Sequence, residues 1–118
     1  MLPYFKVMIL EGLTGNETAS KVLLYLESYG SGYPRGISEI FEISISQVQR
    51  QLERFEHEGI LVSRLVGKTR VYEWNPRCFY LEDLKNILSK SLERLPETIK
   101  EKYFRARTRP RRKGKPLP

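Results

Sequence analysis

Cysteine and histidine are almost absent from this chain, in which Cys78 and His57 are the single representatives of each. One cysteine cannot form a disulfide within the chain, so we expect a protein of a reducing compartment. One cysteine and one histidine are also too few for a Cys/His metal site. The composition therefore predicts a cytoplasmic protein with no bound metal and no other cofactor.

Long apolar runs are absent as well. No segment approaches the roughly 20 apolar residues of a membrane span, and the run over residues 7–10 is too short for the apolar region of a signal peptide. The sequence contains no Ser/His/Asp set and no glycine-rich loop that could hold a phosphate. We therefore expect no membrane segment and no enzymatic activity.

Charge is distributed unevenly. The chain has 21 basic and 14 acidic residues, which gives a net charge of +7 and suggests an anionic partner. Residues 100–118 contain nine of the basic groups and one acidic group, so the rest of the chain is nearly neutral. Beyond Phe104 there is no apolar periodicity, and prolines and glycine accompany the charges, which predicts a disordered basic tail.

The first part of the chain is predicted to form two helices. Residues 2–13 are apolar and form a short first helix. The run Thr14-Gly15-Asn16-Glu17 fits a capping box, in which Thr14 and Glu17 satisfy backbone donors at the start of a second helix. That helix extends to about Tyr29 and is ended by residues 30–32. Apolar residues at helical spacing form its buried face, namely Ala19, Val22, Leu23, Leu26 and Tyr29.

Two further helices follow, separated by a short turn. Pro34 suits the first turn of a helix over about 34–41, whose Ile37 and Phe41 face inward. Residues 42–44 form the turn, and a longer helix covers about 45–58 before Gly59 ends it. The predicted inward stripe of this longer helix consists of Ile45, Val48, Leu52 and Phe55.

A β-hairpin and C-terminal helices are expected next. Residues 60–66 are rich in β-branched side chains, residues 67–69 form a tight turn, and residues 70–74 alternate as a returning strand. A helix then spans about 80–94, and Pro96 separates it from a short helix that ends near Phe104. The apolar residues of this region form a broad stripe, namely Leu81, Leu84, Ile87, Leu88, Leu92 and Leu95.

This order of elements predicts an α+β, mostly α, winged helix-turn-helix. The segment Phe55-Glu56-His57-Glu58-Gly59-Ile60-Leu61, with the helices before it and the hairpin after it, resembles the ArsR/MarR-type transcriptional regulators. The resemblance covers about residues 15–76. Glu42 stands where that family often has glycine, and the paired cysteines of its metal-sensing members are absent. We expect one domain over 1–104, with C-terminal helices over 80–104 and a flexible tail over 105–118.

The resemblance implies a regulator that binds double-stranded DNA. In a winged helix the longer helix enters the major groove, so its outer face would contact bases and the hairpin would contact the backbone or minor groove. Gln47 and Arg50 are the candidates for base contacts, because glutamine can pair with adenine and arginine with guanine. Candidates for other DNA contacts are Ser44, Ser46, Arg54, Lys68, Thr69 and Arg70, followed in the tail by Arg105, Arg107, Arg109, Arg111, Arg112 and Lys113.

Alternatives remain open for each of these functions. From Arg35 to Arg70 there are six basic and five acidic residues, a weak excess for a protein that binds a duplex. A nonspecific nucleic-acid-associated adaptor, which uses the winged helix for protein–protein interaction, is therefore the second hypothesis. The tail could be a solubilising end or an arm that follows phosphates. The leucine stripe could pack on its own chain, or it could form a homodimer through the N-terminal helix and/or residues 80–95.

Overall fold

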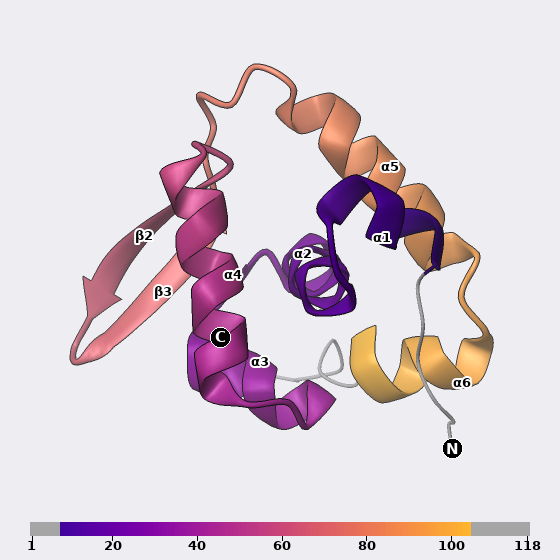
Figure 1. Cartoon of the computed structure of the whole chain (residues 1–118), viewed down its shortest axis with the longest axis horizontal. Coiled ribbons are helices and arrows are strands. Elements are labelled where there is room, and N and C mark those ends of the chain that lie inside the picture. The colour runs from indigo at the N-terminus through magenta and orange to yellow at the C-terminus, as the bar shows by residue number, and fades with distance from the viewer. Residues whose placement is uncertain (1–7, 105–118) are drawn as a thin grey trace, which may run out of the picture.

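The computed structural model describes residues 8–104, in which one buried helix, α2, organises the others. α1 spans Met8–Thr14 and α2 spans Glu17–Tyr29. Figure 1 views α2 end-on at the centre of the molecule, with α1, α4 and α5 around it. Its buried side chains lie on more than one face and include Val22, Leu24 and Leu26, because helices pack on it from several directions. The part of the first predicted helix that falls on residues 2–7 lies outside the described residues.

The capping box predicted for α2 is wrong by two residues. Asn16 is the N-cap, and its Oδ1 accepts a hydrogen bond of 2.8 Å from the Ala19 backbone amide. Thr14 is instead the last residue of α1, and its hydroxyl lies 2.7 Å from the buried Ser20 hydroxyl. Asparagine and threonine both suit a cap, and the end of α1 at Thr14 leaves Asn16 in the extended conformation that an N-cap needs.

The predicted helix-turn-helix is confirmed. α3 spans Pro34–Phe41 and α4 spans Ile45–His57. Glu42 lies between them in the left-handed conformation, with φ 57° and ψ 46°, and its amide donates to the Ser38 carbonyl. A left-handed residue is what glycine supplies at such a turn, so glutamate adopts here the backbone geometry that favours glycine.

A three-stranded antiparallel sheet carries the wing, which we define as the hairpin of β2 (Leu61–Val66) and β3 (Thr69–Trp74). The sequence predicts this hairpin but not β1, a two-residue strand over Ser31–Gly32 in the segment that is expected to end α2. β1 pairs with β3, with Ser31 opposite Glu73, so the strand order is β1-β3-β2. In Figure 1 the wing projects from α4, on the side away from α1 and α5.

The C-terminal helices return to α2. α5 spans Leu81–Glu93, and a short α6 (Glu97–Ile99) continues into a π-helical turn, η1, over Lys100–Phe104. Leu88 is fully buried, whereas Ile87 is 43% exposed, so the predicted leucine stripe is only partly covered within the chain. η1 is fixed to α2 by a hydrogen bond of 2.6 Å from the Tyr29 hydroxyl to the Tyr103 carbonyl.

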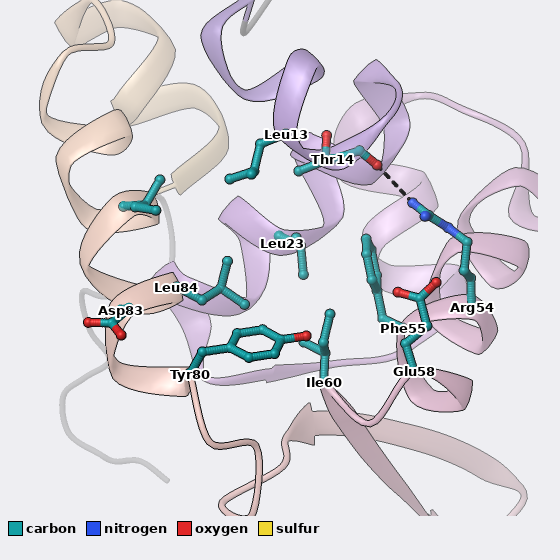
Figure 2. Close-up of a pocket in the computed structure, with 11 residues that line it drawn as sticks. Leu13, Thr14, Leu23, Arg54, Phe55, Glu58, Ile60, Tyr80, Asp83 and Leu84 are labelled. Carbon is teal, nitrogen blue, oxygen red and sulfur yellow. Dashed lines mark hydrogen bonds between the residues drawn. The ribbon is translucent and has the colours of Figure 1, made fainter.

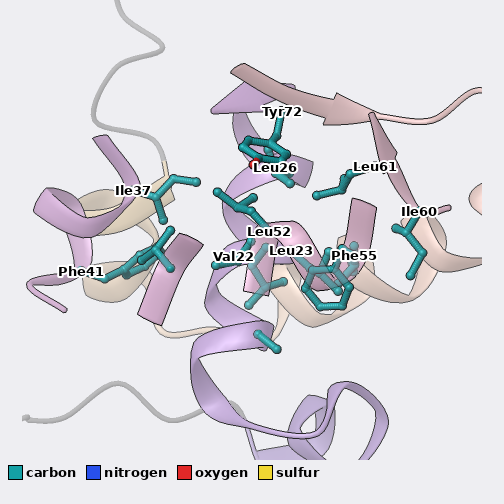
Figure 3. Close-up of a cluster of buried hydrophobic side chains, with 14 of the residues drawn as sticks. Val22, Leu23, Leu26, Ile37, Phe41, Leu52, Phe55, Ile60, Leu61 and Tyr72 are labelled. Atoms are coloured by element: carbon teal, nitrogen blue, oxygen red, sulfur yellow. The ribbon is translucent and has the colours of Figure 1, made fainter. Parts of the chain in front are cut away.

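One apolar cluster joins these elements (Figure 3). The inward stripe of α4 is confirmed for Val48, Leu52 and Phe55, which lie against α2. It is wrong for Ile45, which is 36% exposed at the first position of α4. The observed order of helices and strands confirms the mostly α, α+β winged helix-turn-helix. Within residues 8–104, none of the helices has the length and apolar character that crossing a membrane requires.

Gly32 provides a test of this packing. A Cβ atom at Gly32 would lie 2.8 Å from Cε1 of Tyr25 and 3.1 Å from Cδ1 of Ile37, so an added methyl group collides with the core. We expect Gly32→Ala to lower the free energy of unfolding by about 1–3 kcal/mol, the usual cost of overpacking. Urea denaturation followed by circular dichroism measures this loss.

Gly12→Ala is the matched control, because a Cβ at Gly12 in α1 meets no atom within 4 Å. It should leave stability unchanged or raise it by up to about 1 kcal/mol, since alanine favours the helix. Equal unfolding midpoints for the two variants would contradict the close approach of β1 to α2.

Candidate nucleic-acid interface

The outer face of α4 is defined by what its inner face buries. Because Val48, Leu52 and Phe55 lie in the core, the opposite side of the helix faces solvent. Ser44 caps the helix, and its Oγ accepts a hydrogen bond of 3.2 Å from the Gln47 amide. The exposed side chains of this face are Ser46, Gln47, Gln49, Arg50, Glu53 and His57.

A groove of about 350 Å³ lies between the outer face of α4, the start of α3 and the tip of the wing. We call it the basic groove, because the three charged side chains that line it, Arg35, Lys68 and Arg70, are all cations. Such a surface attracts an extended anion. The complete lining consists of Tyr33, Pro34, Arg35, Ile45, Gln49, Lys68, Thr69 and Arg70.

Arg70 is held in place by hydrogen bonds that connect the wing to α4. Its Nη1 donates to the Ser63 hydroxyl at 2.9 Å, and that hydroxyl donates to Oε2 of Glu56 at 2.7 Å. Tyr72 follows Arg70 by two residues in β3, so the two side chains lie on the same face of the hairpin. Burial, followed by the negative charge of Glu56, raises the pKa of Tyr72 above its usual value.

Arg54 lies apart from the basic groove. Its Nη2 donates to the Thr14 carbonyl at 2.9 Å and to Oε1 of Gln51 at 3.0 Å, and its guanidinium lies 4.7 Å from the centre of the Phe55 ring. Figure 2 shows the side chain directed from α4 to the end of α1. These contacts attach α4 to α1 and favour a structural role for Arg54.

A second, mostly apolar pocket of about 320 Å³ lies between α1, α4 and α5 (Figure 2). Leu23, Leu84 and Phe55 contribute to its interior, and Tyr80 crosses it from the start of α5. Across the described part of the chain, no three His, Cys, Asp or Glu side chains come together as a metal-binding group.

The structure brings together part of the predicted DNA-binding set. Lys68, Thr69 and Arg70 meet α4 at the basic groove, and Ser44, Ser46, Gln47 and Arg50 lie exposed on α4. The candidates from Arg105 to Lys113 lie outside the described residues. Sequence reasoning missed five groove residues, namely Tyr33, Pro34, Arg35, Ile45 and Gln49. The place of Arg35 directly after Pro34, at the start of α3, could have indicated it, because helix starts attract anions.

No protein-family model matches this sequence, and no curated protein is significantly similar to it. Two solved structures are similar in fold, each with a TM-score of 0.52. The AntR antimony-specific transcriptional repressor is 21% identical over 75% of this chain and 81% of its own. A MarR-family transcriptional regulator from Rhodococcus sp. RHA1 is 19% identical over 79% of this chain and 72% of its own. These likenesses confirm the fold that the sequence resemblance predicted.

The contacts of Arg54 predict a loss of stability on its removal. Arg54→Ala leaves the Thr14 carbonyl without this donor, and a charged hydrogen bond of this kind contributes about 1.5–3 kcal/mol. We expect a decrease of that size in the free energy of unfolding, measured by urea denaturation. The control is Arg50→Ala on the exposed face of the same helix, which should change stability by less than about 0.5 kcal/mol. Identical midpoints would show that the link between α4 and α1 contributes nothing.

Proposed function

We propose that this protein is a non-enzymatic transcriptional regulator that binds double-stranded DNA through α4 and the wing. The basic groove carries the proposal, because it gathers three cations beside an exposed helix in a winged helix-turn-helix. Two proteins of similar fold are a transcriptional repressor and a transcriptional regulator. In this fold the helix after the turn enters the major groove and the hairpin reaches the neighbouring backbone.

In this proposal the exposed face of α4 contacts the bases, and the basic groove contacts the DNA backbone. Gln47 and Arg50 lie exposed on α4 and reach base edges, where glutamine pairs with adenine and arginine with guanine. The hydroxyls of Ser44 and Ser46 lie 3.3 Å apart at the start of α4, where the backbone amides also favour a phosphate. The sugar-phosphate strand passes along the basic groove, where Arg35, Lys68, Thr69 and Arg70 contact it.

We also propose a homodimer, formed through α1 and residues 80–95. Three exposed apolar side chains, Leu13, Tyr80 and Ile87, line the pocket between α1 and α5, with exposed fractions of 60%, 37% and 43%. A second copy of the chain would bury them and would place two recognition helices about a two-fold axis.

The basic tail, residues 105–118, is proposed as an arm that adds phosphate contacts to the domain over 1–104. Tyr103 and Phe104 pack on Phe41 at the end of α3, with ring centroids 5.4 and 5.8 Å apart. The chain therefore leaves the described region beside the turn that precedes α4. A tail that starts there begins close to the proposed DNA-binding face.

A nonspecific adaptor is the second candidate function. The observation in its favour is the near balance of six basic and five acidic residues between Arg35 and Arg70. In this case the tail would supply the affinity for nucleic acid, and the winged helix would contact another protein.

Selection from a pool of random-sequence duplexes separates the two candidates. We expect retained duplexes to share a palindromic consensus with half-sites about 10 base pairs apart, because a two-fold dimer places its helices one turn of DNA apart. Sequencing of the retained pool is the measurement. Binding without enrichment would favour the adaptor and contradict the regulator.

Arg50→Ala serves as the internal control of that selection. It should lose about 1–3 kcal/mol of affinity for the consensus and relax the preference at one base position of each half-site. A uniform loss on all sequences would show that Arg50 contacts only phosphate.

Deletion of residues 105–118 tests the arm. The segment carries seven basic and no acidic groups, so contacts by all of them would steepen the slope of log affinity against log salt by roughly 6 per chain. We expect the truncated protein to show a much flatter slope while it keeps the same consensus. Titration of a labelled duplex at several salt concentrations measures the slope. An unchanged slope and affinity would leave the tail without a role in binding.

A further inference from the structure

Ile45 is an apolar side chain in an unexpected place. It is the first residue of α4, and it is 36% exposed although its spacing from Val48 and Leu52 predicts a core position. Ile45 lies in the basic groove, where Tyr33 and Pro34 face it from the start of α3. The groove thus contains an apolar surface at the N-terminal end of α4, beside the face that is proposed to enter the major groove.

The position of Tyr33 is fixed by the glycine beside it. A Cβ at Gly36 would lie 3.0 Å from Cζ of the Tyr33 ring, so the ring lies directly against the backbone of α3. Tyr33 remains 42% exposed in this arrangement. Tyr33 thus rests on α3, and Ile45 is 36% exposed at the N-terminal end of α4.

The charges around Ile45 limit what can contact it. Arg35, Lys68 and Arg70 line the same groove and favour an anionic strand. The apolar group that DNA offers in its major groove is the 5-methyl of thymine, and alanine, threonine and phenylalanine side chains are known to contact it. A β-branched aliphatic side chain beside the phosphate path fits that methyl group and offers nothing to a polar base edge.

We propose that Ile45 is a specificity-determining residue that contacts the 5-methyl group of a thymine in the major groove. The proposal rests on the proposed DNA-binding function and extends it from arginine and glutamine contacts to an apolar one. It predicts that each half-site of the preferred sequence contains a thymine whose methyl group increases affinity. Removal of that methyl group should weaken binding only when Ile45 is present.

Deoxyuridine in place of thymidine removes the methyl group and leaves base pairing intact. Duplexes retained in the selection are resynthesised with deoxyuridine at one thymidine position at a time, and their affinities for the wild-type protein are measured by titration. We expect one position in each half-site at which affinity falls about fourfold, the effect of losing one buried methyl-sized group. Ile45→Ala removes three of the four side-chain carbons, so this variant should lose most of the difference in affinity between the thymidine and deoxyuridine duplexes.

Two further variants control the experiment. Ile45→Val keeps a β-branched aliphatic group and should retain part of the deoxyuridine penalty. Gln49→Ala alters a polar side chain one turn later in the same groove and should retain all of it. Thermal unfolding by circular dichroism should be similar for all variants, since Ile45 and Gln49 are both exposed.

The outcomes separate this inference from the function on which it rests. A consensus that tolerates deoxyuridine at every position overturns the methyl contact and leaves sequence-specific binding intact. A deoxyuridine penalty that persists in Ile45→Ala also overturns it, because another residue then contacts the methyl group. A pool without any enriched sequence overturns both the contact and the proposed regulator.

Discussion

The burial of α2 is the constraint on which the rest of the structure depends. Val22, Leu24 and Leu26 have no exposed surface, and α1, α4, α5 and η1 all pack against this helix. Since apolar burial is the main favourable term in folding, each of these elements is oriented by the face that it turns toward α2. The faces that point away from α2 are the exposed ones. The packing of α4 on α2 therefore determines which side of α4 lines the groove, although no residue of α2 lies in the groove itself.

The wing is also oriented by the residues that it buries. Leu61 and Tyr72 are buried at its base, where the hairpin joins the core, and β1 adds a third strand beside β3. Strand alternation places Arg70 on the same face as Tyr72. The guanidinium of Arg70 donates to the Ser63 hydroxyl, which in turn donates to Glu56. The buried residues at the base of the hairpin thus determine which way the charged residues near its tip point. A rigid base gives the cations of the tip a defined place beside α4.

The periodicity of apolar residues predicted the elements that are determined by local spacing along the chain. The helices, the hairpin and the resemblance to winged helix-turn-helix regulators came from repeated apolar positions and turn residues, which require no knowledge of neighbours. β1 was missed because two residues carry no period. The core position predicted for Ile45 is wrong because periodicity gives a direction around the helix and does not show whether another element covers the first turn. The hydrogen bond between Arg54 and the Thr14 carbonyl could not be predicted, because the two residues lie 40 positions apart in the sequence.

The proposed DNA-binding face is distinguished by the separation of basic from acidic side chains, more than by net charge. The segment from Arg35 to Arg70 is nearly balanced, and on this count alone its affinity for a polyanion is weak. Folding separates the two signs: three of its six basic residues line the groove with no carboxylate among the lining side chains. Glu56 binds Ser63 behind Arg70 and thus orients a cation. Local fields decide contacts within a Debye length of about 8–10 Å, whereas net charge governs attraction at longer range. In the proposed function, the cationic groove makes the short-range contacts and the basic tail supplies the long-range attraction of an otherwise neutral domain.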